Sequence, residues 1–236
     1  MMAWFARGLR QGVDAMDDDS RAPVSPGLSP GRPLPTPAGQ MDDASLCPTG
    51  ALEVRAGVTV PDYARCVQCL RCVRAGAPIR WEQSYRWAVS RTGALGPAFR
   101  RSIHVRVLDA GDCGACLAEV RQLTSPVYSL HRFGIFVTPT PRNADVLMVV
   151  GPVTRAMRTA MRETYAAMPE PRRVIATGTC ALTGGVFAKS VAVEGAVSRV
   201  IPVDVEIPGC PPPPLAILHG LHLLMGREGP GRPDPR

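Results

Sequence analysis

Eight cysteines carry the chemistry of this 236-residue chain, and they fall into two groups of four. The first group contains a C-x-x-C-x-x-C run, in which Cys66, Cys69 and Cys72 follow one another at three-residue intervals. Such a run forms a tight loop that directs three thiolates at one cube of iron and sulfide. The spacing therefore predicts an electron-transfer cluster rather than a disulfide framework.

The fourth ligand of this cube has to come from outside the run. A bacterial ferredoxin run would continue with three residues and a Cys-Pro pair, but Gly76 stands at that position. In two-cluster ferredoxins, the Cys before Pro in one run ligates the cluster of the other run. Cys47-Pro48 is interpreted as the surviving tail of such a first run. Residues 41–82 are thus expected to form a small ferredoxin-like α+β domain with one [4Fe-4S] cluster.

A structural zinc site with four cysteines is the alternative, because zinc also accepts paired C-x-x-C spacing. Three cysteines at consecutive three-residue intervals suit a cube better than a tetrahedral ion, which usually takes two pairs. Disulfides are less expected than a cluster or a zinc site, because nothing at the N-terminus resembles a secretory segment. The reduced thiols of such a protein favour metal binding or catalysis.

The second group is spread over a longer segment, and its members follow short apolar runs. The cysteines are Cys113, Cys116, Cys180 and Cys210, and the runs before them are 103–108, 174–176 and 200–207. These runs are typical of strands. In an open α/β sheet, sites lie beyond the carboxyl ends of the strands. Four distant thiolates are therefore expected to converge there.

The remaining pattern indicates the same architecture. Two continuous apolar runs, 134–138 and 145–150, are typical of parallel strands buried on both faces. Residues 155–167 place Met157, Met161 and Tyr165 on one face of a helix, and residues 215–225 form an apolar helix after a proline run. Strands that alternate with helices predict a flavodoxin-like α/β fold, a doubly wound parallel sheet.

Residues 103–226 resemble the small-subunit family shared by the 20 kDa subunit of complex I and the small subunits of membrane-bound, energy-converting [NiFe] hydrogenases. Four segments carry the resemblance in the family's order: Cys113-Gly-Ala-Cys116-Leu-Ala-Glu119, His131 to Thr154, Gly178-Thr-Cys180-Ala-Leu-Thr-Gly-Gly185, and Ile207-Pro-Gly-Cys210-Pro-Pro212. Complex I subunits carry two adjacent cysteines at the first position, whereas hydrogenase-type subunits carry C-x-x-C. The spacing of Cys113 and Cys116 favours the hydrogenase branch.

The resemblance implies that the second group ligates a proximal [4Fe-4S] cluster beside an active site in a separate large subunit, which makes two [4Fe-4S] clusters in the chain. It implies an electron-transfer subunit of a membrane-associated [NiFe]-hydrogenase-like complex of the formate hydrogenlyase type, without catalysis of its own. A complex I-like quinone oxidoreductase is the alternative, and an interaction protein with structural zinc on its cysteines is the second alternative. The implied partners are a large subunit of the [NiFe]-hydrogenase or complex I 49 kDa type, membrane subunits, and ferredoxin-type electron carriers.

Residues beside the cysteines are candidates for tuning the second cluster. Gly114, Gly178 and Gly209 would let backbone amides approach the sulfurs, as would Gly184 and Gly185. Turns between strands and helices would explain the same glycines. Glu119 lies one helical turn after Cys116 and is a candidate proton carrier, or else a solvated carboxylate that complements the helix dipole.

Composition is consistent with a subunit that needs partners. The net charge is +7. Nucleic acid is not expected as a partner, because no nucleic-acid fold is recognised and few aromatics are available to stack bases. The charge is expected to meet acidic subunits or anionic lipid head groups. The sequence has no apolar run of about twenty residues and no export signal, so it is expected in the cytoplasm, peripheral on the inner face of the membrane.

The segments outside the two domains are expected to carry no chemistry. Residues 4–13 predict a short amphipathic helix that lies on a membrane or a partner, within an N-terminal segment that extends to residue 40. The Pro, Gly, Ser and Asp content of residues 17–44 predicts a poorly ordered linker. Residues 83–101 connect the ferredoxin-like domain to the α/β domain of residues 102–226, and residues 227–236 predict a disordered tail.

Overall fold

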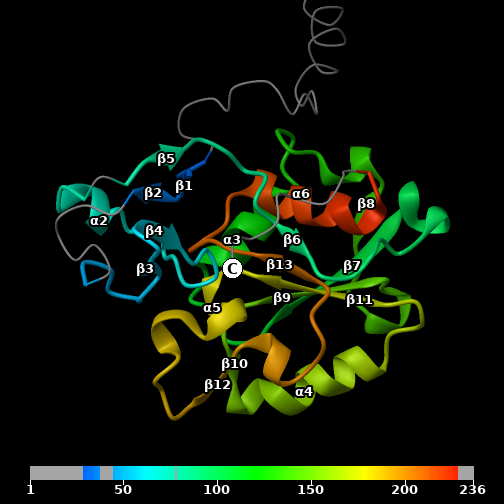
Figure 1. Cartoon of the computed structure of the whole chain (residues 1–236). Coiled ribbons are helices and arrows are strands. Elements are labelled where there is room, and N and C mark those ends of the chain that lie inside the picture. The colour runs from blue at the N-terminus through cyan, green and yellow to red at the C-terminus, as the bar shows by residue number, and fades with distance from the viewer. Residues whose placement is uncertain (1–28, 38–44, 78, 228–236) are drawn as a thin grey trace, which may run out of the picture.

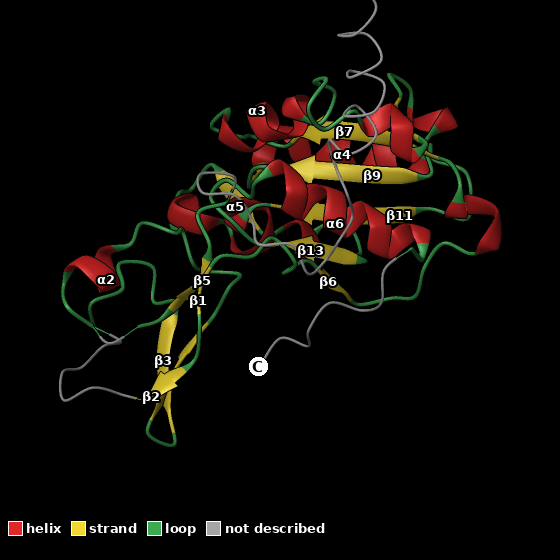
Figure 2. Cartoon of the chain, turned by 90° about the horizontal axis from the view of Figure 1, so that it is seen from above, coloured by secondary structure: helices red, strands yellow, loops and turns green. Residues whose placement is uncertain are grey.

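The structure is a computed structural model that describes residues 29–37, 45–77 and 79–227. A small lobe of short strands and one helix lies beside a larger α/β lobe, and it packs at the end of the sheet toward which β9 points (Figures 1 and 2). The N-terminal amphipathic segment of residues 4–13 falls outside the described residues. Among the described helices, none combines the length and the hydropathy needed to cross a bilayer.

The α/β lobe is built on a six-stranded sheet in the order β6-β13-β11-β9-β7-β8. The strands are β6 (Val89–Ser90), β7 (Ile103–Asp109), β8 (Ile135–Val137), β9 (Val146–Val150), β11 (Arg173–Thr177) and β13 (Val205–Ile207). Every pairing is parallel except that of β6 with β13. Counted along the chain, the five parallel strands have the spatial order 2-1-3-4-5, which is the flavodoxin-like order. The predicted doubly wound α/β fold is confirmed.

The alternation of side chains along β9 explains why its whole run is apolar. Val146, Met148 and Val150 pack into one core, and Leu147 and Val149 pack into another on the opposite face. The first core lies under α3 (Ala115–Gln122) and α6 (Pro214–Met225), and the second lies under α4 (Arg155–Ala166) and α5 (Thr179–Thr183) (Figure 1). A strand with cores on both faces has no side that favours polar residues.

The two long helices bury different fractions of their surface. In α4, Met161 is buried and Met157 and Tyr165 are partly buried against the same core, so the predicted apolar face is confirmed. The helix α6 is buried from Ala216 to Met225 and begins at Pro214, where a missing N–H costs nothing. The prolines before α6 thus help to set its first turn close to Cys210.

The small lobe contains a hairpin, three short strands and one turn of helix. The strands β3 (Leu52–Arg55) and β4 (Val58–Pro61) form the hairpin, and β2 (Thr36–Pro37) pairs with the outer edge of β4. In addition, β1 (Arg32–Pro33) pairs with β5 (Trp81–Glu82). The single helix is α2 (Arg71–Arg74), which carries Cys72.

The prediction of a poorly ordered linker over residues 17–44 is wrong for residues 29–37, which form β1 and β2. Proline has no backbone N–H to donate, so short edge strands are the part of a sheet that accepts it. Arg32 anchors the segment, because its guanidinium donates to Glu82 Oε2 from Nε at 3.1 Å and from Nη2 at 3.0 Å. The rest of residues 17–44 lies outside the described residues.

The connector of residues 83–101 also takes part in the fold. It supplies β6 at the edge of the main sheet and the 3-10 turn η1 (Pro97–Arg100). The Trp87 indole N–H donates to the carbonyl of Pro208 at 2.9 Å, which ties the connector to the loop before Cys210. At the other end of the chain, Arg227 donates to the carbonyls of Arg100 and Phe133, each at 2.7 Å, so the predicted disordered tail is held at its first residue.

The remaining short elements line the ends of the main sheet. A two-stranded antiparallel pair joins β10 to β12. Their bounds and those of the 3-10 turns are β10 (Val153–Thr154), β12 (Val193–Gly195), η2 (Leu130–Phe133), η3 (Pro141–Asn143), η4 (Gly185–Phe187) and η5 (Val197–Arg199).

Candidate metal centres

The loop that carries the first cysteine group contains two left-handed residues just before α2. Gln68 and Leu70 both have left-handed backbones, with φ of 54° and 57°. Residues with a Cβ adopt this conformation rarely, and they keep it only where the surrounding structure compensates for the strain. These two residues bend the run that carries Cys66, Cys69 and Cys72, so that all three cysteines line one cavity.

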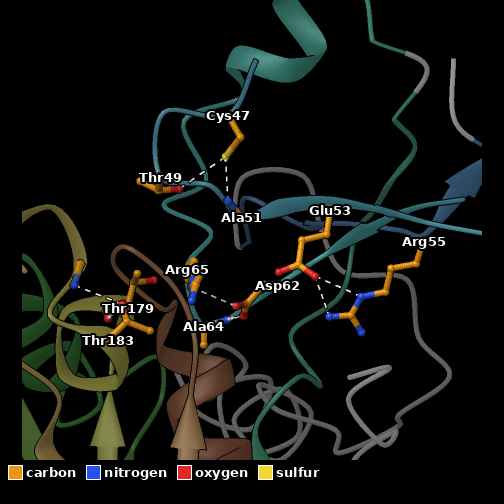
Figure 3. Close-up of polar contacts among 11 residues, drawn as sticks. Cys47, Thr49, Ala51, Glu53, Arg55, Asp62, Ala64, Arg65, Thr179 and Thr183 are labelled. Atoms are coloured by element: carbon orange, nitrogen blue, oxygen red, sulfur yellow. Dashed lines mark hydrogen bonds and ion pairs between the residues drawn. The ribbon is translucent and has the colours of Figure 1, made fainter. Parts of the chain in front are cut away.

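Cys47 lines the same cavity, which has a volume of about 350 Å³. The Ala51 backbone N–H donates to Cys47 Sγ at 3.2 Å, and the Thr49 hydroxyl lies 3.5 Å from that sulfur (Figure 3). The structure thus brings together the four cysteines that the spacing assigned to one cube, including the one that lies outside the run.

The electrostatics of the first site reflect burial. Burial raises the pKa of the Cys66 thiol to about 12; a backbone hydrogen bond at Gln68 offsets part of the rise, and Cys47, Cys72 and Cys69 add to it. Burial also raises the pKa of Cys72. A thiol must lose its proton to bind a metal, so iron or zinc binding here releases protons.

The second site lies beyond the carboxyl ends of three parallel strands. Cys113 follows β7, Cys180 lies in α5 after β11, and Cys210 follows β13. Cys116 lies in the first turn of α3 and is only 5% exposed. Since the carboxyl ends of parallel strands meet at one edge of a sheet, cysteines far apart in the sequence become neighbours.

Two aspartates shape the loop between β7 and α3. Asp109 Oδ1 accepts hydrogen bonds from the backbone of Gly111 at 2.9 Å and of Asp112 at 2.7 Å. Asp112 Oδ2 accepts from the backbone of Gly114 and Leu117, both at 3.0 Å. Asp112 thereby satisfies N–H groups at the start of α3, as side chains near a helix N-terminus commonly do. The loop that carries Cys113 is fixed at both ends.

The thiols of the second site influence one another. Burial raises the pKa of Cys116, and the charges of Asp112, Cys180, Cys210 and Cys113 raise it further. Burial raises the pKa of Cys180 to about 11, and Cys210 is the next largest cause. Burial likewise raises the pKa of Cys210 itself. Cys116 and Cys180 form the buried side of the site, and Cys113 and Cys210 are exposed.

The candidate glycines have different surroundings. A Cβ built on Gly178 would lie 2.6 Å from Cys116 Sγ, and one on Gly185 would lie 2.6 Å from Cys180 Sγ. One on Gly209 would meet the Pro212 backbone at 2.5 Å, whereas one on Gly114 would meet nothing within 4 Å. Close approach to sulfur therefore accounts for Gly178 and Gly185, and turn geometry accounts for Gly114, whose φ is +96°.

Glu119 lies beside the second site. It lines an open cavity of about 690 Å³ together with Gln68, Tyr128, Cys210 and four prolines. Burial raises the pKa of the Glu119 carboxyl. Burial also raises the pKa of Tyr128, and the charge of Glu119 raises it further. Glu119 and Cys210 thus face the same cavity.

The donor set of each site fits an iron–sulfur cluster. Within the described ranges, no three or more His, Cys, Asp or Glu side chains are arranged to hold a metal ion. The donors that share each place are nonetheless four soft sulfurs, which is the ligand set of a [4Fe-4S] group. A cube spreads its four ligands over four irons, so its thiolates do not have to meet at one point.

Sequence reasoning missed the residues that connect the two sites. The Thr179 hydroxyl donates to the carbonyl of Cys66 at 3.0 Å, and the Cys210 backbone N–H donates to Gln68 Oε1 at 3.4 Å. No signal in the sequence marks these pairs, since their partners lie 113 and 142 residues apart. Asp112 could have been found, because an acidic residue just before a cysteine and a glycine is a common start of a helix.

Comparison with known proteins identifies the family of the chain. Residues 113–224 match the family "NADH ubiquinone oxidoreductase, 20 Kd subunit". The probable membrane-bound hydrogenase subunit mbhJ of Pyrococcus furiosus is 42% identical over 125 residues, which cover 53% of this chain and 75% of that protein. The chain belongs to this family.

Two further relatives are similar over part of their length. Formate hydrogenlyase subunit 7 of Escherichia coli is 39% identical over 152 residues. The aligned region covers 61% of this chain and 60% of that relative. A chain from the structure of an archaeal membrane-bound sulfane sulfur reductase is 33% identical, with a TM-score of 0.49, over 57% of this chain and 76% of that one.

Proposed function

We propose that this chain is an electron-transfer iron–sulfur subunit of a membrane-associated complex of the [NiFe]-hydrogenase type. The observation that carries the proposal is the gathering of eight cysteines into two sets of four, each in one place, in a chain of this family. The first set is Cys47, Cys66, Cys69 and Cys72, and the second is Cys113, Cys116, Cys180 and Cys210.

Each set would hold one [4Fe-4S] cluster, which accepts and releases single electrons when bound. The chain's own residues fix the conditions for that transfer. The Ala51 N–H donates to a ligand sulfur of the first site, which stabilises negative charge there. In the second site, burial of Cys116 and Cys180 excludes water from one side, and the exposed Cys113 and Cys210 face the side on which a partner would sit.

Glu119 is the proposed proton carrier. Burial raises the pKa of its carboxyl above the ordinary value, in the direction that favours the protonated form. The cavity that it lines also reaches Cys210 and Tyr128, which gives a proton a wet route to the second site. The chain would then couple an electron step to a proton step, although catalysis would belong to a large subunit.

A complex I-like quinone oxidoreductase is the second candidate. The 690 Å³ cavity beside Cys210 favours it, because prolines and Tyr128 give this cavity an apolar wall with a carboxyl at one side. The C-x-x-C spacing of Cys113 and Cys116 supports the hydrogenase candidate instead. The proposed partners are a large subunit of either type, membrane subunits of the same complex and ferredoxin-type carriers, with the chain peripheral on the inner face of the membrane.

The first experiment is an inventory of metal and sulfide in the anaerobically purified chain. Two cubes require about eight irons and about eight acid-labile sulfides per chain. Stoichiometric zinc without sulfide would instead establish structural metal sites and end the electron-transfer proposal.

The second experiment separates the two candidate complexes. The chain is purified with its large subunit from the native membrane, and nickel is measured per complex. Nickel together with hydrogen-dependent reduction of a dye supports the hydrogenase type. A nickel-free complex that reduces a soluble quinone supports the second candidate.

A further inference from the structure

The two candidate sites are joined by a hydrogen bond from a buried threonine to a partly buried cysteine. The Thr179 side chain donates through Oγ1 to the carbonyl oxygen of Cys66 at 3.0 Å, and Thr179 is 1% exposed. Thr179 is the residue directly before Cys180, a ligand of the second site, while Cys66 is itself a ligand of the first site. Its helix, α5, lies where the small lobe meets the sheet (Figures 1 and 2).

This contact forms a short route through bonds from one ligand to the other. From Cys180 the route follows one peptide bond to Thr179, passes through its Cβ and hydroxyl, crosses one hydrogen bond, and continues from the Cys66 carbonyl to the Cys66 sulfur. Electronic coupling decays with every bond and falls more steeply at each gap, so a route with one short hydrogen bond is favoured. Burial strengthens that bond, because no water competes for the hydroxyl.

The other cross-link gives a poorer route. The Cys210 backbone N–H donates to Gln68 Oε1 at 3.4 Å, a longer bond than that of Thr179. The route then follows the whole Gln68 side chain and reaches a residue that is not itself a ligand. A small pocket lined in part by Cys66, Gln68 and Gly209 also lies between the lobes.

We propose that the Thr179 hydroxyl is the bridge through which electrons pass between the two four-cysteine sites. This inference rests on the proposed function, because it requires a cluster in each site. In the transfer, one site loses one electron and the other gains it. The proton stays on Thr179 Oγ1, and no covalent bond forms or breaks.

Three variants isolate the hydroxyl. Thr179→Val keeps the shape of the side chain but removes the donor, and Thr179→Ser keeps the donor but removes a methyl group. Thr177→Val is the matched control, because Thr177 is also fully buried, two residues away on β11, and its hydroxyl has no hydrogen-bond partner among the described residues. Each variant is prepared anaerobically, and its iron and sulfide are counted first.

The readouts are the rate of electron transfer between the clusters after flash reduction and the magnetic interaction between the two reduced clusters by electron paramagnetic resonance. Thr179→Val is expected to keep both clusters and both reduction potentials, to slow the transfer at least severalfold and to weaken the exchange interaction. Thr179→Ser and Thr177→Val are expected to match the wild-type chain.

Wild-type transfer in Thr179→Val with both clusters present would overturn the bridge and leave the proposed function intact. If Thr179→Val loses a cluster, Thr179→Ala is measured in its place, and wild-type transfer there overturns the bridge equally. Slow transfer in Thr177→Val would also overturn it, since the effect would then belong to any change in the buried region. A wild-type chain without iron and sulfide would overturn the proposed function itself.

Discussion

Gly178 packs against the sulfur of Cys116 so closely that a Cβ at position 178 would lie 2.6 Å from Cys116 Sγ. Its φ of +91° is also one that residues with a Cβ rarely adopt. Two independent constraints therefore require glycine here. Its ψ of 153° places it in a region essentially restricted to glycine, where the backbone constraint alone costs another residue about 1–3 kcal/mol. The steric overlap adds to that cost by displacing a proposed ligand.

Gly178→Ala is predicted to prevent occupation of the second site and to spare the first. Gly114→Ala is the control for a positive φ beside the second site: its added Cβ would meet nothing within 4 Å, and its ψ is −19° where that of Gly178 is 153°. Iron content and the electron paramagnetic resonance spectra of the two variants provide the measurement. Equal iron loss in both variants would mean that backbone strain, and not contact with the sulfur, explains Gly178.

Cys47→Ser is predicted to remove the same cluster signal as Cys69→Ser and to leave the other signal intact. The reason is that both cysteines line one cavity, although Cys47 lies well before the C-x-x-C-x-x-C run. Electron paramagnetic resonance of the reduced chain distinguishes the signals. An unchanged spectrum in Cys47→Ser would show that the fourth ligand lies elsewhere.

Cys180→Ser is predicted to interrupt electron flow at its last step before the large subunit. Because the first site lies in a separate lobe, its cluster should still accept electrons from a reductant. Turnover of the assembled complex with hydrogen or quinone should be lost, and the two measurements are made on the same preparation. Full turnover in this variant would contradict the placement of the second site beside the partner's active site.

The cluster-free chain is predicted to lose stability at alkaline pH. In the folded chain the pKa of Cys180 is raised from its ordinary 9.0 to about 11, so the unfolded chain releases this proton first as the pH increases. The stabilisation is therefore complete below pH 9 and declines toward pH 11. Thermal unfolding of the reduced apoprotein at a series of pH values measures the decline.

The comparison for this pH effect is Cys180→Ser, since a serine hydroxyl does not ionise in that range. The variant should show a shallower decline, while the remainder persists because burial also raises the pKa of Cys116 and, to about 12, that of Cys66. A decline as steep as that of the wild-type chain would assign the effect to other groups.

Arg32→Met is predicted to destabilise the small lobe by about 1.5–3 kcal/mol, the range for hydrogen bonds to charged groups. The Arg32 side chain is 11% exposed, and its partner Glu82 would lose two charge-assisted hydrogen bonds. Arg55→Met is the control, because the pair of Arg55 with Glu53 is exposed at 53% and 45% and contributes at most about 1 kcal/mol. Urea unfolding, followed by the absorbance of the first cluster, measures the loss of stability in Arg32→Met and in Arg55→Met.

The sequence was most informative where one physical effect acts alone. Burial on both faces produces the continuous apolar run of β9, so that strand and the doubly wound fold class could be predicted. Elements defined by tertiary pairing could not: β6 has two residues and α5 has five, too few for any periodicity. The segment of residues 29–37 has the composition of a linker, and only its pairing with β4 and β5 makes it part of the fold.

The same division applies to the sites. Three proposed ligands of the first site are visible in the sequence because a local loop determines their spacing, and Cys47 was assigned to it from the ferredoxin pattern. The proposed ligands of the second site were placed by the rule that sites lie beyond the carboxyl ends of strands. The contacts of Thr179 with Cys66 and of Gln68 with Cys210 depend on how two lobes meet, and no local pattern encodes that.

The unequal spread of the two cysteine sets has a consequence for the order in which the protein matures. Cys66, Cys69 and Cys72 lie within one loop, so bringing them together requires the closure of only short segments of chain. Cys113, Cys180 and Cys210 become neighbours only after β7, β11 and β13 have paired in the sheet. We expect the first site to capture its cofactor on a nascent or partly folded chain, whereas the second can be filled only on a finished surface. Delivery machinery would therefore have to recognise the folded α/β lobe through the exposed Cys113 and Cys210, before a large subunit covers them.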